Sequence, residues 1–186
     1  IPLIEIGTEP DIKSPDQCQE AAKKIGMLLR SLSGVKRGLG TIRQDVNVSI
    51  KEGTRIEING AQDLRMIPTY VELEIKRQEE LIKIKKELHG LRLNDLEIID
   101  CSTIMSESEA KIIKSALEKE GKILGIKLHG FSGYVGRELQ PGYRLGTEFS
   151  GRAKVKAGIK GIFHSDELPN YGISQKEVKL LKKKLK

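Results

Sequence analysis

The stretch IRQDVNVSIKEGTRIEIN, residues 42–59, decides the predicted fold of the first half of the chain. On either side of its central Lys-Glu-Gly, apolar and polar residues alternate, which is the period of a β-strand with one buried face. The Lys-Glu-Gly suits a three-residue turn in which the glycine takes a positive φ. The resulting register sets Val48 opposite Ile56 and Val46 opposite Ile58. We therefore predict a β-hairpin.

The second face of this hairpin must carry polar side chains, because a one-residue step along a strand changes the face. Two interpretations fit such a dense polar array: a solvated outer face with cross-strand ion pairs, or the floor of a polar site. The residues alone leave both open. The polar positions are Arg43, Asp45, Asn47 and Ser49 on the first strand and Arg55, Glu57 and Asn59 on the second.

Two helices are predicted beside the hairpin. The first follows Ser14 as N-cap, with Pro15 in its first turn, and runs to about Leu32. The second covers residues 66–88 and ends at Gly90. Their predicted inner faces carry Ala21, Ile25, Leu28 and Leu32 in the first helix and Val71, Ile75, Gln78 and Ile82 in the second.

The second half alternates between short strands and helices, which indicates an α+β layer rather than a helical bundle. A glycine-dense connector, residues 130–146, suits either tight turns or a close approach of backbone to a nucleotide. Standard nucleotide-loop patterns are absent from the sequence. The predicted elements are strands at 96–100, 122–128 and 155–163 and helices at 106–120, begun by Ser106, and 174–185, begun by Ser174.

Composition narrows the class of protein. The chain has 186 residues, a length that suits one large or two small domains. Of these residues, 38% are hydrophobic and 32% are charged. Its two cysteines, Cys18 and Cys101, lie far apart without a metal-ligand spacing. They therefore argue against a zinc site and a disulfide scaffold, and a reducing cytosol is the expected compartment. Residues 1–100 carry a net charge of −1 and residues 101–186 of +8, which favours a polyanionic partner for the second half.

The opening segment IPLIEI is predicted to be a short strand in which Glu5 interrupts an apolar run. A carboxylate there faces either water or a bound ion, because an unpaired buried charge is costly. Glu9 and Asp11 follow closely and could add oxygen ligands of the kind that Mg²⁺ prefers.

Three ordered motifs resemble the tRNA-dependent amidotransferase subunits of the B and E types. They are PLIEIGTEPDIKSP at 2–15, GTIRQDVNVSIKEGTRIEINGAQDLRMIP at 40–68 and VELEIKRQ at 71–78. The RQDVN at 43–47 differs from the bacterial B-type pattern and points to the archaeal E type. FSGYVGRELQPGYRLGTEFS at 131–150 and GIFHSDELPNYGIS at 161–174 resemble the domain that the E type shares with bacterial aspartyl-tRNA synthetases.

The resemblance implies an α+β fold: a β-rich cradle segment at residues 1–92, then an insertion domain at 93–186. It implies ATP-dependent phosphorylation of glutamate on tRNA(Gln), followed by amidation with ammonia from a partner, the asparaginase-like amidase of the D type. The expected whole is a cytoplasmic heterotetramer without a membrane or DNA partner. The isolated chain is expected to be inactive. A module that binds tRNA or another subunit, without catalytic residues of its own, is the alternative.

The resemblance also implies site residues. Glu5 aligns with a family metal ligand, and Glu9 is expected to join it around Mg²⁺. The hairpin residues Arg43, Asp45, Asn47, Arg55 and Glu57 are expected to line the pocket or channel of the catalytic site.

Overall fold

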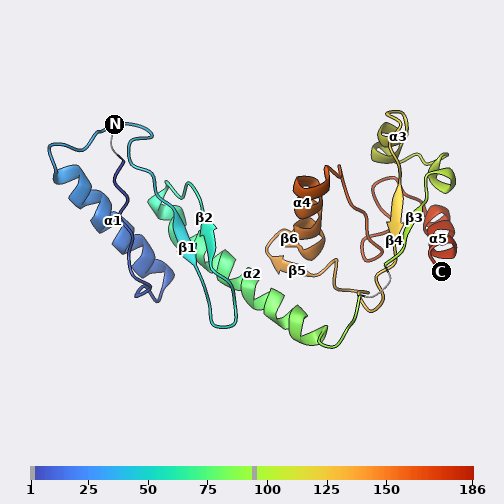
Figure 1. The fold of residues 1–186 in the computed structure, drawn as a ribbon, viewed down its shortest axis with the longest axis horizontal. Helices are drawn as coiled ribbons and strands as arrows, with labels where there is room; N and C mark the ends of the chain where they lie inside the picture. The colour runs from blue at the N-terminus through green and yellow to red at the C-terminus, as the bar shows by residue number, and fades with distance from the viewer. Residues whose placement is uncertain (1–2, 94–95) are drawn as a thin grey trace. The chain divides into compact units, whose positions relative to one another are not determined.

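The structure is a computed structural model that describes residues 3–93 and 96–186 (Figure 1). Contacts divide the chain into two compact units, residues 1–83 and 84–186. Helices and small antiparallel sheets are mixed in it, so the fold class is α+β, as predicted. The predicted domain division after residue 92 stays a prediction. Within the described residues, no helix is long and apolar enough to span a membrane.

The first unit is built around the predicted hairpin, which packs on a long helix (Figure 1). Strands β1 and β2 pair antiparallel with Val46 opposite Ile58 and Val48 opposite Ile56, so the predicted register is confirmed. The unit's elements are α1 (Pro15–Ser31), β1 (Val46–Val48), β2 (Ile56–Ile58), the 3-10 helix η1 (Leu64–Met66) and α2 (Ile67–Glu87), whose last residues, from Ile84 on, belong to the second unit.

The core of this unit lies between the hairpin and α2. The apolar side of β1 is buried there, and the face of α2 that carries Val71 and Gln78 points toward it, as predicted. Cys18 and Ala22 of α1 pack against the same core. The buried apolar residues of this cluster are Val46, Val48, Ala61, Ile67 and Val71.

Helix α1 begins as predicted, with the Ser14 hydroxyl accepting from the backbone N–H of Gln17 at 3.1 Å. Its predicted inner face is wrong in the last turns, because Leu28 and Leu32 are 67% and 56% exposed. The side that packs on the core instead carries Cys18 and Ala22, which is shifted by about one residue from the predicted row. Apolar spacing alone did not distinguish these two neighbouring stripes.

The hairpin turn differs from the prediction in one detail. Glu52, with φ 68°, takes the left-handed conformation, and Gly53 does not. The glycine is needed for space, since a Cβ there would lie 2.1 Å from Oε1 of Gln78. A glycine is thus required at this position of the turn, as predicted, but because of the space it leaves for Gln78 and not because of a positive φ.

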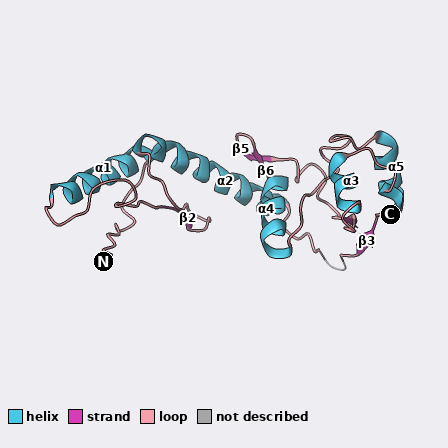
Figure 2. Cartoon of the chain, turned by 90° about the horizontal axis from the view of Figure 1, so that it is seen from above, coloured by secondary structure: helices cyan, strands magenta, loops and turns pink. Residues whose placement is uncertain are grey.

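The second unit consists of short elements joined by loops (Figure 2). Strands β3 and β4 pair antiparallel, with Ile98 opposite Ile126. The core joins Met105, Ala110 and Ile113 to the last helix through Val178. Its elements are β3 (Ile98–Asp100), the 3-10 helix η2 (Thr103–Met105), α3 (Lys111–Leu117), β4 (Leu124–Ile126), β5 (Glu138–Gln140), β6 (Tyr143–Arg144), α4 (Leu145–Ala157) and α5 (Gln175–Lys184).

Three predicted elements are wrong. Residues 3–6 form no strand, while residues 1–2 lie outside the described residues. The helix predicted from Ser106 begins only at Lys111, because residues 103–105 form a 3-10 turn first. The strand predicted at 155–163 is helix α4 up to Ala157 and loop beyond it. The glycines within the LGTEFSG segment are poor helix formers and masked this helix.

The glycine-dense connector forms tight turns. Gly142, with φ 73°, turns the chain between β5 and β6, and Gly133, with φ 83°, turns it earlier. The structural interpretation of these glycines, turns among short strands, is confirmed.

Candidate functional site

The outer face of the hairpin brings the predicted catalytic residues together. Asn47 of β1 lies directly opposite Glu57 of β2, and both are exposed while their strand neighbours are covered. Arg43, Asp45 and Arg55 occupy the same alternate positions just outside the three-residue strands and are exposed too. We call these five residues the polar hairpin face.

The charged side chains of the polar hairpin face do not form ion pairs with one another. Asp45 accepts a hydrogen bond from the backbone N–H of Gly60 at 2.7 Å, which fixes its carboxylate beside the end of β2. Throughout the described residues, Arg43, Arg55 and Glu57 show no salt bridge. The cross-strand ion pairs of the solvated interpretation are therefore not formed, and these groups can contact a ligand.

Two glutamines extend the hairpin beyond its strands. Gln62 accepts from the backbone N–H of Gln44 at 2.8 Å and donates to the carbonyl of Ile42 at 2.9 Å. Gln44 in turn donates to the carbonyl of Ala61 at 3.1 Å. These bonds hold the backbone on both sides of Arg43, so this arginine projects from a fixed base.

A buried polar network on α2 supports the turn end of the hairpin. The side chain of Gln78, 4% exposed, accepts from the backbone N–H of Thr54 at 3.1 Å and donates to Glu74 at 2.8 Å. Arg77 contacts both carboxylate oxygens of Glu74, at 2.8 and 3.0 Å. Sequence reasoning placed Gln78 on the inner face but missed these bonds. A buried glutamine among apolar positions was the available sign, since buried amides need partners.

The predicted metal ligands lie elsewhere in the first unit. Glu5 and Glu9 are exposed in chain that has no regular structure, beside Leu3 and Ile4, which are 94% and 81% exposed. Among the described residues, no group of three or more His, Cys, Asp or Glu could hold a metal ion. The residues present therefore do not form a complete metal site on their own, and the assignment of Glu5 and Glu9 stays a prediction.

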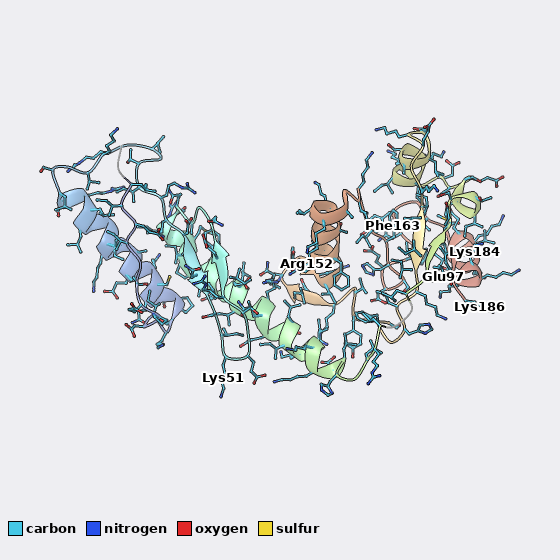
Figure 3. All side chains as sticks on the ribbon, in the orientation of Figure 1. Lys51, Glu97, Arg152, Phe163, Lys184 and Lys186 are labelled. Carbon is cyan, nitrogen blue, oxygen red and sulfur yellow. The ribbon has the colours of Figure 1, made fainter. Side chains whose placement is uncertain are left out.

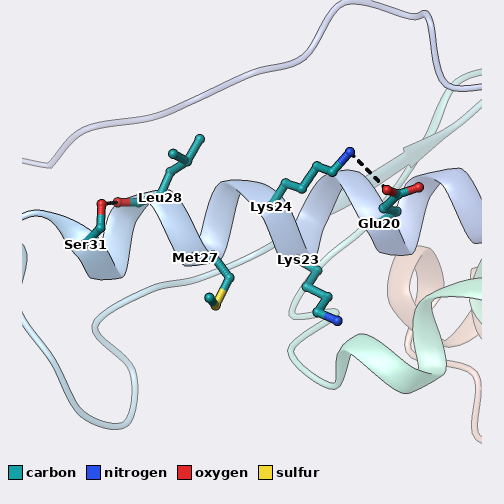
Figure 4. A pocket seen from close by; sticks show the side chains of 6 residues that line it. All are labelled: Glu20, Lys23, Lys24, Met27, Leu28 and Ser31. Atoms are coloured by element: carbon teal, nitrogen blue, oxygen red, sulfur yellow. Dashed lines mark hydrogen bonds and ion pairs between the residues drawn. The ribbon is translucent and has the colours of Figure 1, made fainter.

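A depression of about 550 Å³ lies along α1 (Figure 4). Lys24 and Glu20 form a 2.9 Å ion pair at one end of it, and Met27 and Leu28 expose apolar surface further along. None of its lining residues was predicted to act in catalysis. They are Glu20, Lys23, Lys24, Met27, Leu28 and Ser31.

In the second unit, helix α5 concentrates positive charge. Its apolar side, with Val178 and Leu181, packs into the core, while the lysines of the helix and of the two residues after it are exposed; Lys184 and Lys186 are labelled in Figure 3. Ser174 and Glu177 form the predicted capping box. The exposed lysines are Lys176, Lys179, Lys182, Lys183, Lys184 and Lys186.

Another polar cluster in this unit has a structural explanation. Both carboxylate oxygens of Asp166 accept backbone N–H bonds, from Gly133 and Gly136, each at 2.9 Å. Burial raises the pKa of Asp166, but these amide bonds, the nearby His164 and the amide of Val135 together lower it more, so its pKa lies below the usual value. The carboxylate fixes the glycine-rich loop. His164 instead lies with Nε2 3.4 Å from a carboxylate oxygen of Glu167.

Comparisons with known proteins match two families to this chain, and their boundary lies within the second compact unit. Residues 1–122 match the family described as GatB/GatE catalytic domain, and residues 113–186 match the GAD domain. The chain is 55% identical over 184 residues to the E-type subunit of glutamyl-tRNA(Gln) amidotransferase from Methanocaldococcus jannaschii, covering 98% of this chain and 29% of that protein. The E-type protein of Pyrococcus furiosus is 54% identical over 189 residues, which are 100% of this chain and 30% of that protein.

The E-type protein of Thermococcus sibiricus is 58% identical over 182 residues, covering 96% of this chain and 29% of that protein. The chain thus spans about 29% of the length of these relatives. With the family match extending over the hairpin, α2 and the start of the second unit, the chain belongs to the GatB/GatE catalytic domain family.

Proposed function

We propose that this chain contributes the polar hairpin face to the amidation site of a tRNA-dependent amidotransferase. The reaction has two steps. The γ-carboxylate of glutamate on tRNA(Gln) takes the terminal phosphoryl group of ATP and releases ADP. Ammonia from the asparaginase-like amidase of the D type then displaces phosphate and loses a proton, giving Gln-tRNA(Gln). The names of the relatives and the family match support this assignment.

One observation carries the proposal. Asn47 lies opposite Glu57 on the exposed face of the two-stranded hairpin, and Arg43, Asp45 and Arg55 occupy exposed positions on the same face. A transferred phosphoryl group spreads negative charge over its oxygens, and guanidinium groups bind such oxygens with paired N–H bonds. Arg43 and Arg55 are suited to this task. The amide of Asn47 can donate to a carbonyl or phosphate oxygen.

The acids of the polar hairpin face suit the second step. Ammonia must lose a proton after it attacks the acyl phosphate, and a carboxylate within hydrogen-bond reach can accept it. Glu57 is exposed and has no salt bridge in the described part of the chain, so it is available for this role. Asp45, whose carboxylate is bound to Gly60, serves better to orient a ligand than to move a proton.

We also propose ATP as the phosphoryl donor and Mg²⁺ as its companion ion, with Glu5 and Glu9 as carboxylate ligands. Mg²⁺ is usually held by one or two carboxylates together with waters and phosphates, and when bound it supplies charge neutralisation of phosphate oxygens. The complete protein is proposed to be a cytoplasmic heterotetramer with the D-type amidase. The isolated chain is proposed to lack amidation activity.

The proposal is tested in a full-length chimaera. The E-type protein of Methanocaldococcus jannaschii, with its matching segment replaced by this chain, is combined with the D-type amidase, ATP, Mg²⁺ and Glu-tRNA(Gln). We expect Glu57→Gln and Arg55→Lys to lower the rate of Gln-tRNA(Gln) formation about 100-fold. Glu72→Gln, an exposed position on α2, is the matched control. Unchanged rates in both hairpin variants would refute the proposed site.

A second candidate function is supported by the basic surface of α5. Lys176, Lys179 and Lys183 recur at spacings of three and four, so they share one exposed side of the helix. Such a row can neutralise successive phosphates of an RNA. The chain, or its second unit alone, would then bind tRNA without taking part in the chemistry.

A further inference from the structure

We propose that Gln78 is a positioning residue that sets the register of the hairpin and thereby determines which side chains reach the amidation site. This inference rests on the proposed function of the polar hairpin face. It assigns a role to the VELEIKRQ segment, which the proposed chemistry does not use.

Gln78 bonds to both arms of the hairpin from a single side chain. Its Nε2 lies 3.4 Å from the carbonyl oxygen of Val48 in β1, and its Oε1 accepts from the backbone N–H of Thr54, before β2, at 3.1 Å. The side chain is 4% exposed, so these bonds form away from competing water. A slip of one arm relative to the other would break at least one of them.

The rest of the network fixes the orientation of the Gln78 amide. Nε2 also donates to Oε1 of Glu74 at 2.8 Å, which leaves the carbonyl oxygen of the amide toward Thr54. Glu74, 8% exposed, is held by both guanidinium contacts of Arg77. A buried carboxylate paired in this way is an oriented acceptor, and a rotated amide would set the carbonyl oxygen of Gln78 against Oε1 of Glu74.

Burial of Val46 and Val48 favours this register, but the backbone ladder that holds it is short. Each strand has three residues, and the ladder pairs Val46 to Val48 with Ile58 to Ile56. A shift of one residue would turn Asn47 and Glu57 toward the core and expose their apolar neighbours. The contacts of Gln78 at the turn end and those of Gln62 at the open end therefore fix the hairpin at both ends.

Gly53 shows how closely this side chain fits the turn. A Cβ on Gly53 would lie 2.1 Å from Oε1 of Gln78 and 2.8 Å from Cγ1 of Ile50. The turn thus leaves just enough room for the amide to reach Thr54. A side chain that fills the same space without polar atoms would keep the packing but lose both backbone bonds.

The test compares Gln78→Met with Ile84→Ala in the full-length chimaera, with Glu57→Gln as a third variant. Ile84 is also buried on α2 but lies outside the cluster beneath the hairpin, so its replacement destabilises without touching the turn. The measurements are kcat for Gln-tRNA(Gln) formation, the KM for ATP, the thermal midpoint and hydrogen exchange of the Thr54 amide.

We expect Gln78→Met to lower kcat at least about tenfold below Ile84→Ala at a temperature where both are folded, because small misplacements of reacting groups are costly. Exchange at Thr54 should accelerate in Gln78→Met alone. Equal kcat values in the two variants, with Glu57→Gln inactive, would overturn the positioning role and leave the proposed function intact. Unchanged kcat in both Glu57→Gln and Arg55→Lys, the result that refutes the proposed site, would overturn both.

Discussion

The side-chain carbonyl of Gln78 on α2 accepts a hydrogen bond from the backbone N–H of Thr54 at 3.1 Å, across 24 positions of sequence. This bond joins the VELEIKRQ segment of α2 to the hairpin, so that the two pack as one unit. The exposed side of that unit carries the residues proposed for amidation, and its buried side carries the polar network that supports them.

Gly53→Ala should destabilise the first unit. The added methyl group would lie 2.1 Å from Oε1 of Gln78, so either the turn or the amide must move. We expect a loss of about 1–3 kcal/mol in the free energy of unfolding, measured by urea denaturation. Gly26→Ala in α1 is the control, because nothing lies within 4 Å of its Cβ. That change should stabilise by about 0.5–1 kcal/mol, and the reverse order would contradict the turn geometry.

Ser174→Ala should destabilise α5. The Ser174 hydroxyl caps the helix and the Glu177 carboxylate caps Ser174 in return, so the substitution removes one member of a reciprocal pair. We expect a loss of about 1 kcal/mol by thermal denaturation. Ser106→Ala is the comparison, since Ser106 is not the N-cap of α3. A larger loss from Ser106→Ala would mean that α3 begins where the sequence suggested.

Asp166 should make the second unit sensitive to acid. Burial raises its pKa, but the bonds from Gly133 and Gly136, together with the nearby His164 and the amide of Val135, lower it more, so the folded pKa lies below the unfolded one. Such a group stabilises above the unfolded pKa, near 3.8, and this stability is lost as pH falls through the folded pKa. Asp166→Asn should cost about 1 kcal/mol at pH 7, a small value because the site is partly solvated.

The measurement for Asp166 is urea denaturation at pH 7 and at several values below pH 4. The difference between wild type and Asp166→Asn should shrink as pH falls. The exposed neighbour Ser165 provides the control, because Ser165→Ala changes no carboxylate and should leave the pH dependence intact. A difference that is constant with pH would show that the effect of Asp166 does not come from its charge.

The lysine side of α5 should govern salt-dependent RNA affinity. Replacing Lys176, Lys179 and Lys183 together with glutamine should reduce the slope of log K against log salt by about 0.7–0.9 for each phosphate that is no longer neutralised. Fluorescence anisotropy with labelled tRNA measures the slope. Lys23, Lys36 and Lys51 are exposed in the first unit, and their triple replacement changes the net charge equally. Equal slopes for both triple variants would count against α5 as an RNA surface.

Glu5→Gln in the full-length chimaera should raise the Mg²⁺ concentration needed for half-maximal amidation about tenfold, because one anionic ligand is lost. Glu9→Gln should act in the same direction. Glu20→Gln is the control, since Glu20 is paired with Lys24 on α1. An unaltered Mg²⁺ dependence in Glu5→Gln would remove this residue from the metal site.

Local sequence patterns correctly predicted the elements whose formation depends on neighbouring residues, namely the hairpin and the starts of two helices. Alternation gave the hairpin register correctly, since a strand with one buried face has a single register that buries it. Capping residues located the starts of α1 and α5. By contrast, α4 was missed because glycines weaken its helical pattern, and the helix is held by pairs such as Glu148 with Arg152.

The sequence by itself determined which residues form the polar hairpin face, because alternate positions on a strand share a side whatever the strand packs against. Only the tertiary structure decided that Gln78 supports both arms of the hairpin and that Gly53 is required for space rather than for its φ. The physical reason is that these facts depend on contacts between segments far apart in the chain. No periodicity within either segment reports the distance to the other.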